Sequence, residues 1–277
     1  MTKSKSDYSI QTVSNALRVL EVFSEEDEIG VSDLSRRLNL HKNNVFRLLA
    51  TLEENGYIEQ SARSEQYRLG TGCLELGRAF ARGNTLLRSA RPILVELSAL
   101  LGETVHIATL RKTYVIHLDC EAPDQLIMTA SRIGLRLPAS CTALGKVLLA
   151  GLEPEARGQL LKEMSLQSGF ESRTSNTIVD PDKFSEHLSS VAIQGFGVDL
   201  EEYEVGLRCV AAQVHDENGR TVAAISASGP SFRLPKDQLH GTVATAVVPA
   251  AERLRRTTGR SMPGVPTQLP PTRQLAP

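Results

Sequence analysis

The sequence has little net charge and no long apolar run. Its 277 residues carry 31 lysines and arginines against 32 aspartates and glutamates, a formal net charge of −1. This balance excludes a polybasic protein, so any contact with nucleic acid must be confined to a local patch. No apolar run approaches the roughly 20 residues of a membrane-spanning helix, and no apolar segment follows Lys3 and Lys5 as it would in a secretory signal. We therefore expect a cytoplasmic protein with no membrane partner.

Cysteines are few and widely spaced. The four, which form no Cys-x-x-Cys pair, are Cys73, Cys120, Cys141 and Cys209. Free thiols are the expectation for this pattern in a cytoplasmic protein. The sequence also has no nucleophile elbow and no phosphate-binding loop. We therefore expect neither an enzyme nor a cofactor.

Residues 31–68 have the pattern of a DNA-binding unit. Two short helices are indicated by apolar residues at helical spacing, Val31, Leu34, Leu38 and Leu40 in the first and Val45, Leu48, Leu49 and Leu52 in the second. Residues 14–24 indicate another helix beneath them. Gly56 ends the second helix of the pair, and two short strands around a polar turn follow at residues 57–60 and 67–69. This order predicts a winged helix-turn-helix.

The face of the second helix opposite its apolar stripe has residues suited to DNA. Amides match base edges, and a guanidinium matches guanine or phosphate. We expect Lys42, Asn43, Asn44 and Arg47 to face the major groove and Arg36, Arg37, Arg63 and Arg68 to contact the phosphate backbone. No acidic residue lies between Leu34 and Leu52, but acidic residues flank that stretch, so the basic patch is small. Specific binding then needs at least a dimer that reads two half-sites. A small helical bundle with a solvated face is the alternative.

An α+β domain is expected after two linker helices at residues 74–80 and 86–101, which are candidate dimer surfaces. Strand-like runs lie at residues 104–110, 114–120, 126–131, 198–200, 209–215 and 221–228, with helical segments between and after them. This mixed order predicts a largely antiparallel sheet. We place the DNA-binding domain at residues 10–72, the linker helices at 73–102, the second domain at 103–258 and a proline-rich, disordered tail at 259–277.

Two segments of the second domain hold polar groups suited to a small ligand. Residues 134–146 end a strand and begin a helix that Thr142 can cap, and the free N–H groups at a helix start suit a carboxylate. In residues 195–212, Asp199 and Cys209 are polar groups within strand-like sequence. Ser226 and Ser228 face one side of the next strand because side chains alternate. These groups indicate a cup for a small polar ligand; an ordinary strand-to-helix loop is the alternative.

At these residues the chain strongly resembles the IclR family of bacterial transcription regulators. The segment GLRLPASCTALGKVLLA, residues 134–150, looks like the family's first effector-domain motif. The family's C-terminal signature is matched at Gly195, Asp199, Glu202, Cys209, Val210, Ala211, Val214, His215 and Asp216. The predicted winged helix precedes both motifs, so the resemblance covers residues from about Ile10 to Thr258.

The resemblance implies a GAF-like α+β effector-binding domain and a homodimer or homotetramer. It also implies that a small molecule, often an organic acid or an aromatic catabolite, controls binding to double-stranded operator DNA. By carry-over, the effector contacts are Thr142, Ala143, Leu144, Asp199, Leu207, Cys209, Ser226 and Ser228.

Three other interpretations of the same residues remain. A metal site could combine Asp199 and Cys209 with His106 or His117, although no ligand spacing supports it. An enzyme could use Cys141 or Cys209 as a nucleophile, with His106, His117 or His215 as base. The two cysteines could also form a redox switch, but neither has an adjacent basic residue to activate it.

Overall fold

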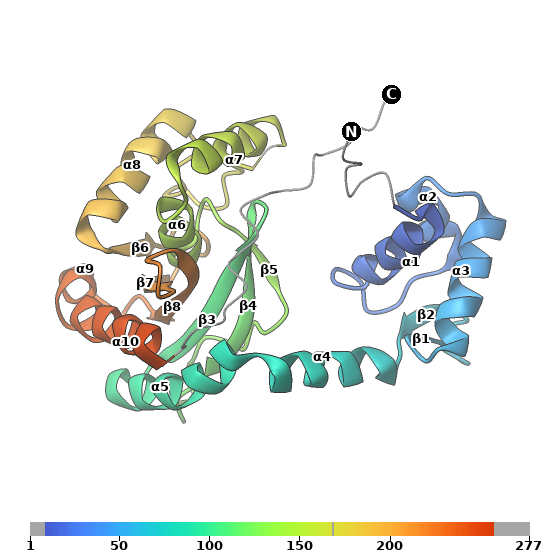
Figure 1. Ribbon diagram of the computed structural model, residues 1–277, viewed down its shortest axis with the longest axis horizontal. Helices are drawn as coiled ribbons and strands as arrows, with labels where there is room; N and C mark the ends of the chain where they lie inside the picture. Colours follow the sequence, from blue (N-terminus) through green and yellow to red (C-terminus); the bar gives the residue numbers. More distant parts are fainter. Residues whose placement is uncertain (1–8, 168, 258–277) are drawn as a thin grey trace. The chain divides into compact units, whose positions relative to one another are not determined.

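The computed structural model describes residues 9–167 and 169–257, and it divides between Asn84 and Thr85 into two compact units (Figure 1). The predicted tail at residues 259–277 lies outside the described residues. Among the helices in the described ranges, none combines the length and apolar character needed to cross a bilayer.

The first unit is a helix-turn-helix with a small β-hairpin, as predicted. Its elements are α1 (Gln11–Val22), α2 (Val31–Leu38), α3 (Lys42–Glu54), β1 (Ile58–Gln60), β2 (Tyr67–Leu69) and α4 (Thr71–Gly83). The predicted apolar stripes meet in one core, where Val19 of α1 packs with Leu34 of α2 and Leu49 of α3. Asn39 ends α2 in the left-handed conformation, with φ of 52°, which permits the tight turn into α3.

The second unit is built on a six-stranded antiparallel sheet with the strand order β5-β4-β3-β8-β7-β6. The strands are β3 (Thr104–Arg111), β4 (Tyr114–Glu121), β5 (Arg136–Pro138), β6 (Phe196–Leu200), β7 (Leu207–His215) and β8 (Thr221–Pro230). The helices are α5 (Thr85–Leu101), α6 (Ala143–Ala150), α7 (Pro154–Leu166), α8 (Pro181–Gln194), α9 (Lys236–Gln238) and α10 (Ala244–Thr257), with a π-helical turn at Leu239–Val243. The predicted α+β architecture is confirmed.

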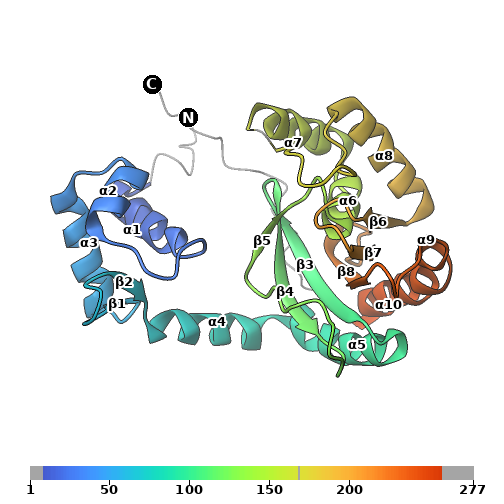
Figure 2. The ribbon, with the colours of Figure 1, turned by 180° about the vertical axis from the view of Figure 1, so that it is seen from behind.

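Helices cover both faces of this sheet (Figures 1 and 2). On one face, Val105, Ile107 and Ile225 pack with α5 and α10. On the other, Ala211 and Ala224 pack with α6, and α7 and α8 close the same core from outside. Because successive side chains of a strand alternate between faces, the residues next to Val105, Ile107 and Ile225 in sequence point toward α6.

The predicted strand at residues 126–131 is wrong. This segment has no regular secondary structure, and the third strand of its half of the sheet is instead β5, which pairs with β4. Its backbone carbonyls are bound by side chains: Thr104 Oγ1 donates to Thr129 O at 3.0 Å, and Arg233 donates to Ile127 O at 2.9 Å. Leu126 is fully exposed, so the apolar residues that suggested a strand do not face a core.

Candidate functional site

The exposed face of α3 holds the four residues predicted for the major groove. His41 caps the helix because its Nδ1 accepts a hydrogen bond from the Asn43 backbone N–H at 3.3 Å. Val45, Leu48, Leu49 and Leu52 are buried against the rest of the unit. Lys42, Asn43, Asn44 and Arg47 are all exposed. Phe46, which was not predicted, is 57% exposed beside them.

Three of the four arginines that were predicted to contact the DNA phosphate backbone form ion pairs within the protein. Arg36 pairs with Asp33 at 2.9 Å, Arg37 pairs with Glu26, and Arg68 pairs with Glu59 at 2.7 Å. Arg63 is exposed in the turn between β1 and β2. Exposed ion pairs contribute only about 0–1 kcal/mol, so a phosphate can replace the carboxylate at little cost.

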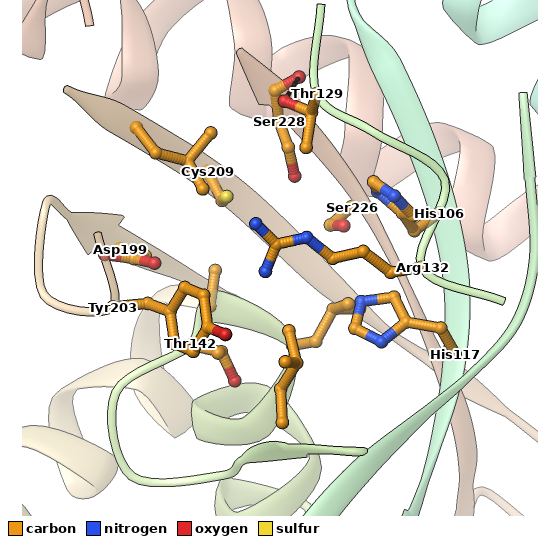
Figure 3. A pocket seen from close by; sticks show the side chains of 14 residues that line it. His106, His117, Thr129, Arg132, Thr142, Asp199, Tyr203, Cys209, Ser226 and Ser228 are labelled. Carbon is orange, nitrogen blue, oxygen red and sulfur yellow. Dashed lines mark hydrogen bonds between the residues drawn. The ribbon is translucent and has the colours of Figure 1, made fainter. Parts of the chain in front are cut away.

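In the second unit, one cavity between α6 and the sheet is lined by all eight residues predicted to contact an effector (Figure 3). They are joined there by His106, His117, Thr129, Arg132, Leu137 and Tyr203. The enclosed free volume among these side chains is about 30 Å³. That space holds only a water molecule or two, so a larger ligand must displace some of the side chains that line the cavity.

Thr142 positions the start of α6 at this cavity. Its hydroxyl accepts a hydrogen bond from the Gly145 N–H at 3.1 Å and donates one to Pro138 O at 3.1 Å. Gly145 allows the preceding loop to approach closely, because a Cβ there would lie 2.2 Å from Ala139 O. The first backbone N–H groups of α6 have no acceptor within the helix and are suited to an anion.

Strand register brings the polar residues of the sheet together in rows. Asp199 of β6 lies opposite Cys209 of β7, which lies opposite Ser228 of β8. In the neighbouring row, Ser226 of β8 lies opposite His106 of β3. These residues come from distant parts of the sequence and all face α6.

Arg132 brings a positive charge into the cavity. Figure 3 shows its side chain reaching between the histidines on one side and Asp199 and Tyr203 on the other. Its guanidinium stacks on the Tyr203 ring, 4.9 Å from the centroid, and donates to Glu204 Oε2 at 3.3 Å. Within the described residues that line the cavity, no other side chain has a permanent positive charge.

Burial shifts the pKa of three other groups in the cavity, His106, His117 and Asp199, toward their neutral forms. Burial, with His117 and Arg132 nearby, lowers the pKa of His106 to about 3. Burial and Arg132 lower the pKa of His117 to about 4. Burial also raises the pKa of Asp199 to about 7, although Asp199 accepts a hydrogen bond from the Glu202 N–H at 2.7 Å. At neutral pH both imidazoles are uncharged, and the raised pKa of Asp199 favours its protonated form more than in a free carboxyl.

The thiols of Cys141 and Cys209 are unreactive. Burial raises the pKa of Cys141 and of Cys209 to about 12, with Asp199 adding to the effect at both. A thiol that stays protonated is a poor nucleophile and oxidises slowly. This argues against the nucleophile and redox interpretations. The described residues also contain no group of three or more His, Cys, Asp and Glu side chains that could hold a metal ion.

A buried ion pair supports the end of β6, which carries Asp199. Lys146 of α6 is fully buried, and its Nζ donates to Val198 O at 2.9 Å and to the Glu202 carboxylate. These contacts tie α6 to the end of β6. Because Asp199 lies between the two bonded positions, its side chain is fixed at the edge of the cavity.

Sequence reasoning missed Arg132, Tyr203 and Thr129 as cavity residues. Thr129 lies within residues 126–131, the segment mistaken for a strand, and Arg132 follows it directly. Neither was expected to face a ligand. Tyr203 follows Glu202 within the second motif, and that proximity to Asp199 was the one available signal. His106 and His117 were considered only as metal ligands or catalytic bases.

Comparison with known families gives the same architecture. The chain matches the IclR helix-turn-helix domain over residues 12–62 and the bacterial transcriptional regulator IclR C-terminal domain over residues 79–256. It is 37% identical over 236 residues to the HTH-type transcriptional regulator KdgR of Dickeya chrysanthemi, which covers 85% of this chain and 76% of that protein.

Solved structures agree with this result. An IclR-type regulator from Silicibacter sp. TM1040 superposes with a TM-score of 0.79 at 27% identity, covering 92% of this chain and 98% of that one. An IclR homolog from Microbacterium hydrocarbonoxydans, solved in complex with 4-hydroxybenzoate, has a TM-score of 0.73 at 23% identity and covers 89% and 98%. The chain therefore belongs to the IclR family and is a DNA-binding transcriptional regulator rather than an enzyme.

Proposed function

We propose that this regulator binds operator DNA through the exposed face of α3 and that a small carboxylate in the cavity of the second unit controls that binding. The observation that carries the proposal is the Arg132 guanidinium inside a cavity whose two histidines are uncharged. An arginine in such surroundings is best neutralised by a carboxylate, which it can hold through two parallel hydrogen bonds.

The groups around Arg132 support a carboxylate further. The N–H groups at the start of α6, in Ala143 and Leu144, add donors that favour negative charge. The serine hydroxyls of β8 add donors on the sheet. Glu204 is Arg132's present partner and is itself 61% exposed, so an incoming carboxylate can replace it. The Microbacterium protein, whose fold is similar, holds 4-hydroxybenzoate, which is also a carboxylate.

We further propose that the chain acts as a homodimer or homotetramer. Helix α4 has no buried residue within the described chain, and it exposes Leu74, Leu76 and Phe80 by 67%, 57% and 55%. Exposed apolar side chains gathered on one helix are typical of an interface. In this proposal residues 10–72 bind DNA, residues 103–258 bind the effector, and the helices between them carry the effector's influence along the chain.

The test combines calorimetry with an operator gel shift. Small aliphatic and aromatic carboxylates, each compared with its amide, are titrated into the wild type and into Arg132→Gln. Arg157→Gln on α7 is the matched control, because it makes the same change outside the cavity. We expect carboxylates to bind in preference to amides and Arg132→Gln to weaken them about tenfold or more. A bound carboxylate should also shift operator affinity. Equal binding of acid and amide, or of wild type and Arg132→Gln, would contradict the proposal.

A further inference from the structure

One wall of the cavity carries buried polar atoms that have no partner. His106, His117 and Ser226 are 1%, 3% and 1% exposed. Nδ1 of His117 and Oγ of Ser226 have no hydrogen-bond partner among the described residues. The ring nitrogens of His106 have no well-aligned partner there either, although the Ala130 backbone lies close enough to act on the pKa of this imidazole. Leaving a buried donor or acceptor unpaired costs about 1–3 kcal/mol. Three such side chains in one place indicate a surface built to bind something.

The three side chains form a single cluster, which we call the histidine wall. His106 and Ser226 are cross-strand partners on β3 and β8. His117 comes from β4, and its ring meets that of His106 edge to face, with centroids 5.1 Å apart and an interplanar angle of 81°. In Figure 3 the wall lies across the cavity from Asp199 and Tyr203, with Arg132 reaching between the two sides.

The wall is polar but uncharged. Burial and the nearby Arg132 keep the pKa of both imidazoles far below neutral pH. A neutral imidazole has one N–H donor and one lone pair, and a serine hydroxyl both donates and accepts. A carboxylate could use only the donors of this wall. A hydroxyl oxygen can use donors and acceptors together. A carbonyl oxygen also uses only the donors, but it has no charge that this uncharged wall would leave unneutralised.

We propose that the histidine wall is a specificity site for a neutral oxygen of the effector, a hydroxyl or a carbonyl carried away from the carboxylate that pairs with Arg132. This inference rests on the proposed function and extends it: the effector is a hydroxy or oxo acid, and an unsubstituted acid of the same shape is discriminated against. The discrimination follows because an unsubstituted acid leaves the wall's polar atoms buried and unpaired.

Matched ligand pairs test the inference by calorimetry. The probes are 4-hydroxybenzoate with benzoate, 4-hydroxybutanoate with butanoate, and any further carboxylate that binds, each with its deoxy counterpart. We expect the oxygenated member of a binding pair to bind about tenfold more tightly. Ser226→Ala, which removes one atom, and His106→Phe, which keeps a ring, should each reduce that preference. His187→Phe on α8 is the control, since His187 is partly buried but does not line the cavity.

A second measurement separates recognition from a merely structural role. The imidazole nitrogen NMR signals of His106 and His117 should shift on addition of the oxygenated acid and stay in place with its deoxy counterpart. Equal binding of both members of every pair, with Arg132→Gln weakening both, would overturn the histidine wall and leave the proposed function standing. Carboxylates that bind no better than their amides would remove the proposed function, and this inference with it.

Discussion

Asp199 is the residue through which pH acts on the cavity. Its carboxyl is 1% exposed, and burial raises its pKa to about 7. In this range the imidazoles of His106 and His117 are already neutral, and the thiols of Cys141 and Cys209 remain protonated. Between about pH 6 and about pH 8, ionisation of Asp199 is therefore the main change in charge.

The sign of the pH effect follows from the ligand's charge. Below its pKa Asp199 is neutral and can donate to a ligand oxygen; above it, two carboxylates would share one site. We expect carboxylate affinity to fall as pH rises through about 7, by at most tenfold per pH unit because one proton is involved. Calorimetry at several pH values measures it. Asp199→Asn should give a flat profile, and an unchanged slope in that variant would assign the dependence to another group.

The Lys146–Glu202 pair makes a prediction about stability. Lys146→Met leaves Glu202 buried without its cation, and breaking a buried pair in this way costs about 3–5 kcal/mol. Lys146→Met combined with Glu202→Leu removes both charges and should recover much of that loss. Urea unfolding followed by circular dichroism compares the variants. A single variant as stable as the wild type would mean that the pair contributes nothing to the fold.

At the scale of elements, α3 has one buried face that stabilises the fold and one exposed face that we propose binds DNA. Arg47→Ala removes a charge from the exposed face and leaves the buried stripe intact. We expect a loss of about 1–3 kcal/mol per half-site in operator binding, with an unchanged unfolding temperature. A gel-shift titration at fixed salt measures the first quantity. Arg157→Ala on α7 is the matched control, and operator affinity equal in the two variants would remove α3 from the interface.

The segment between β4 and β5 shows where prediction from sequence ends. The helix-turn-helix follows from local periodicity, and strand alternation places Ser226 and Ser228 on one face. Arg132 could not be placed, because its segment is fixed by contacts with residues distant in sequence. Thr129 Oγ1 donates to Ser228 O at 3.3 Å across 99 positions of the chain. Residues 126–131 resembled a strand only because of their apolar composition. In the sheet β3 already pairs with β4 on one side and β8 on the other, so it has no free edge for another strand.

At the scale of the whole molecule, assembly is the open prediction. We expect light scattering at micromolar concentration to give a dimer or tetramer. Leu74→Glu with Phe80→Glu should shift the protein toward monomer and weaken operator binding, because charges at an apolar interface are costly to bury. Leu166→Glu on α7, a leucine that is more exposed than Leu74, is the control. Carboxylate binding should persist in both. A wild-type monomer that binds operator tightly would contradict the prediction.

The two faces of the β3–β8 pair have a consequence for how such a regulator changes over evolutionary time. Val105, Ile107 and Ile225 pack with α5 and α10, while His106, between the first two, and Ser226, next to Ile225, face the cavity. Substitution at every second position can therefore rewrite which metabolite is sensed without disturbing the hydrophobic layer behind it. A gene copy that acquires a new effector through a few such changes would still fold. The alternation of a β-strand thus makes the sensor evolvable while its scaffold stays the same.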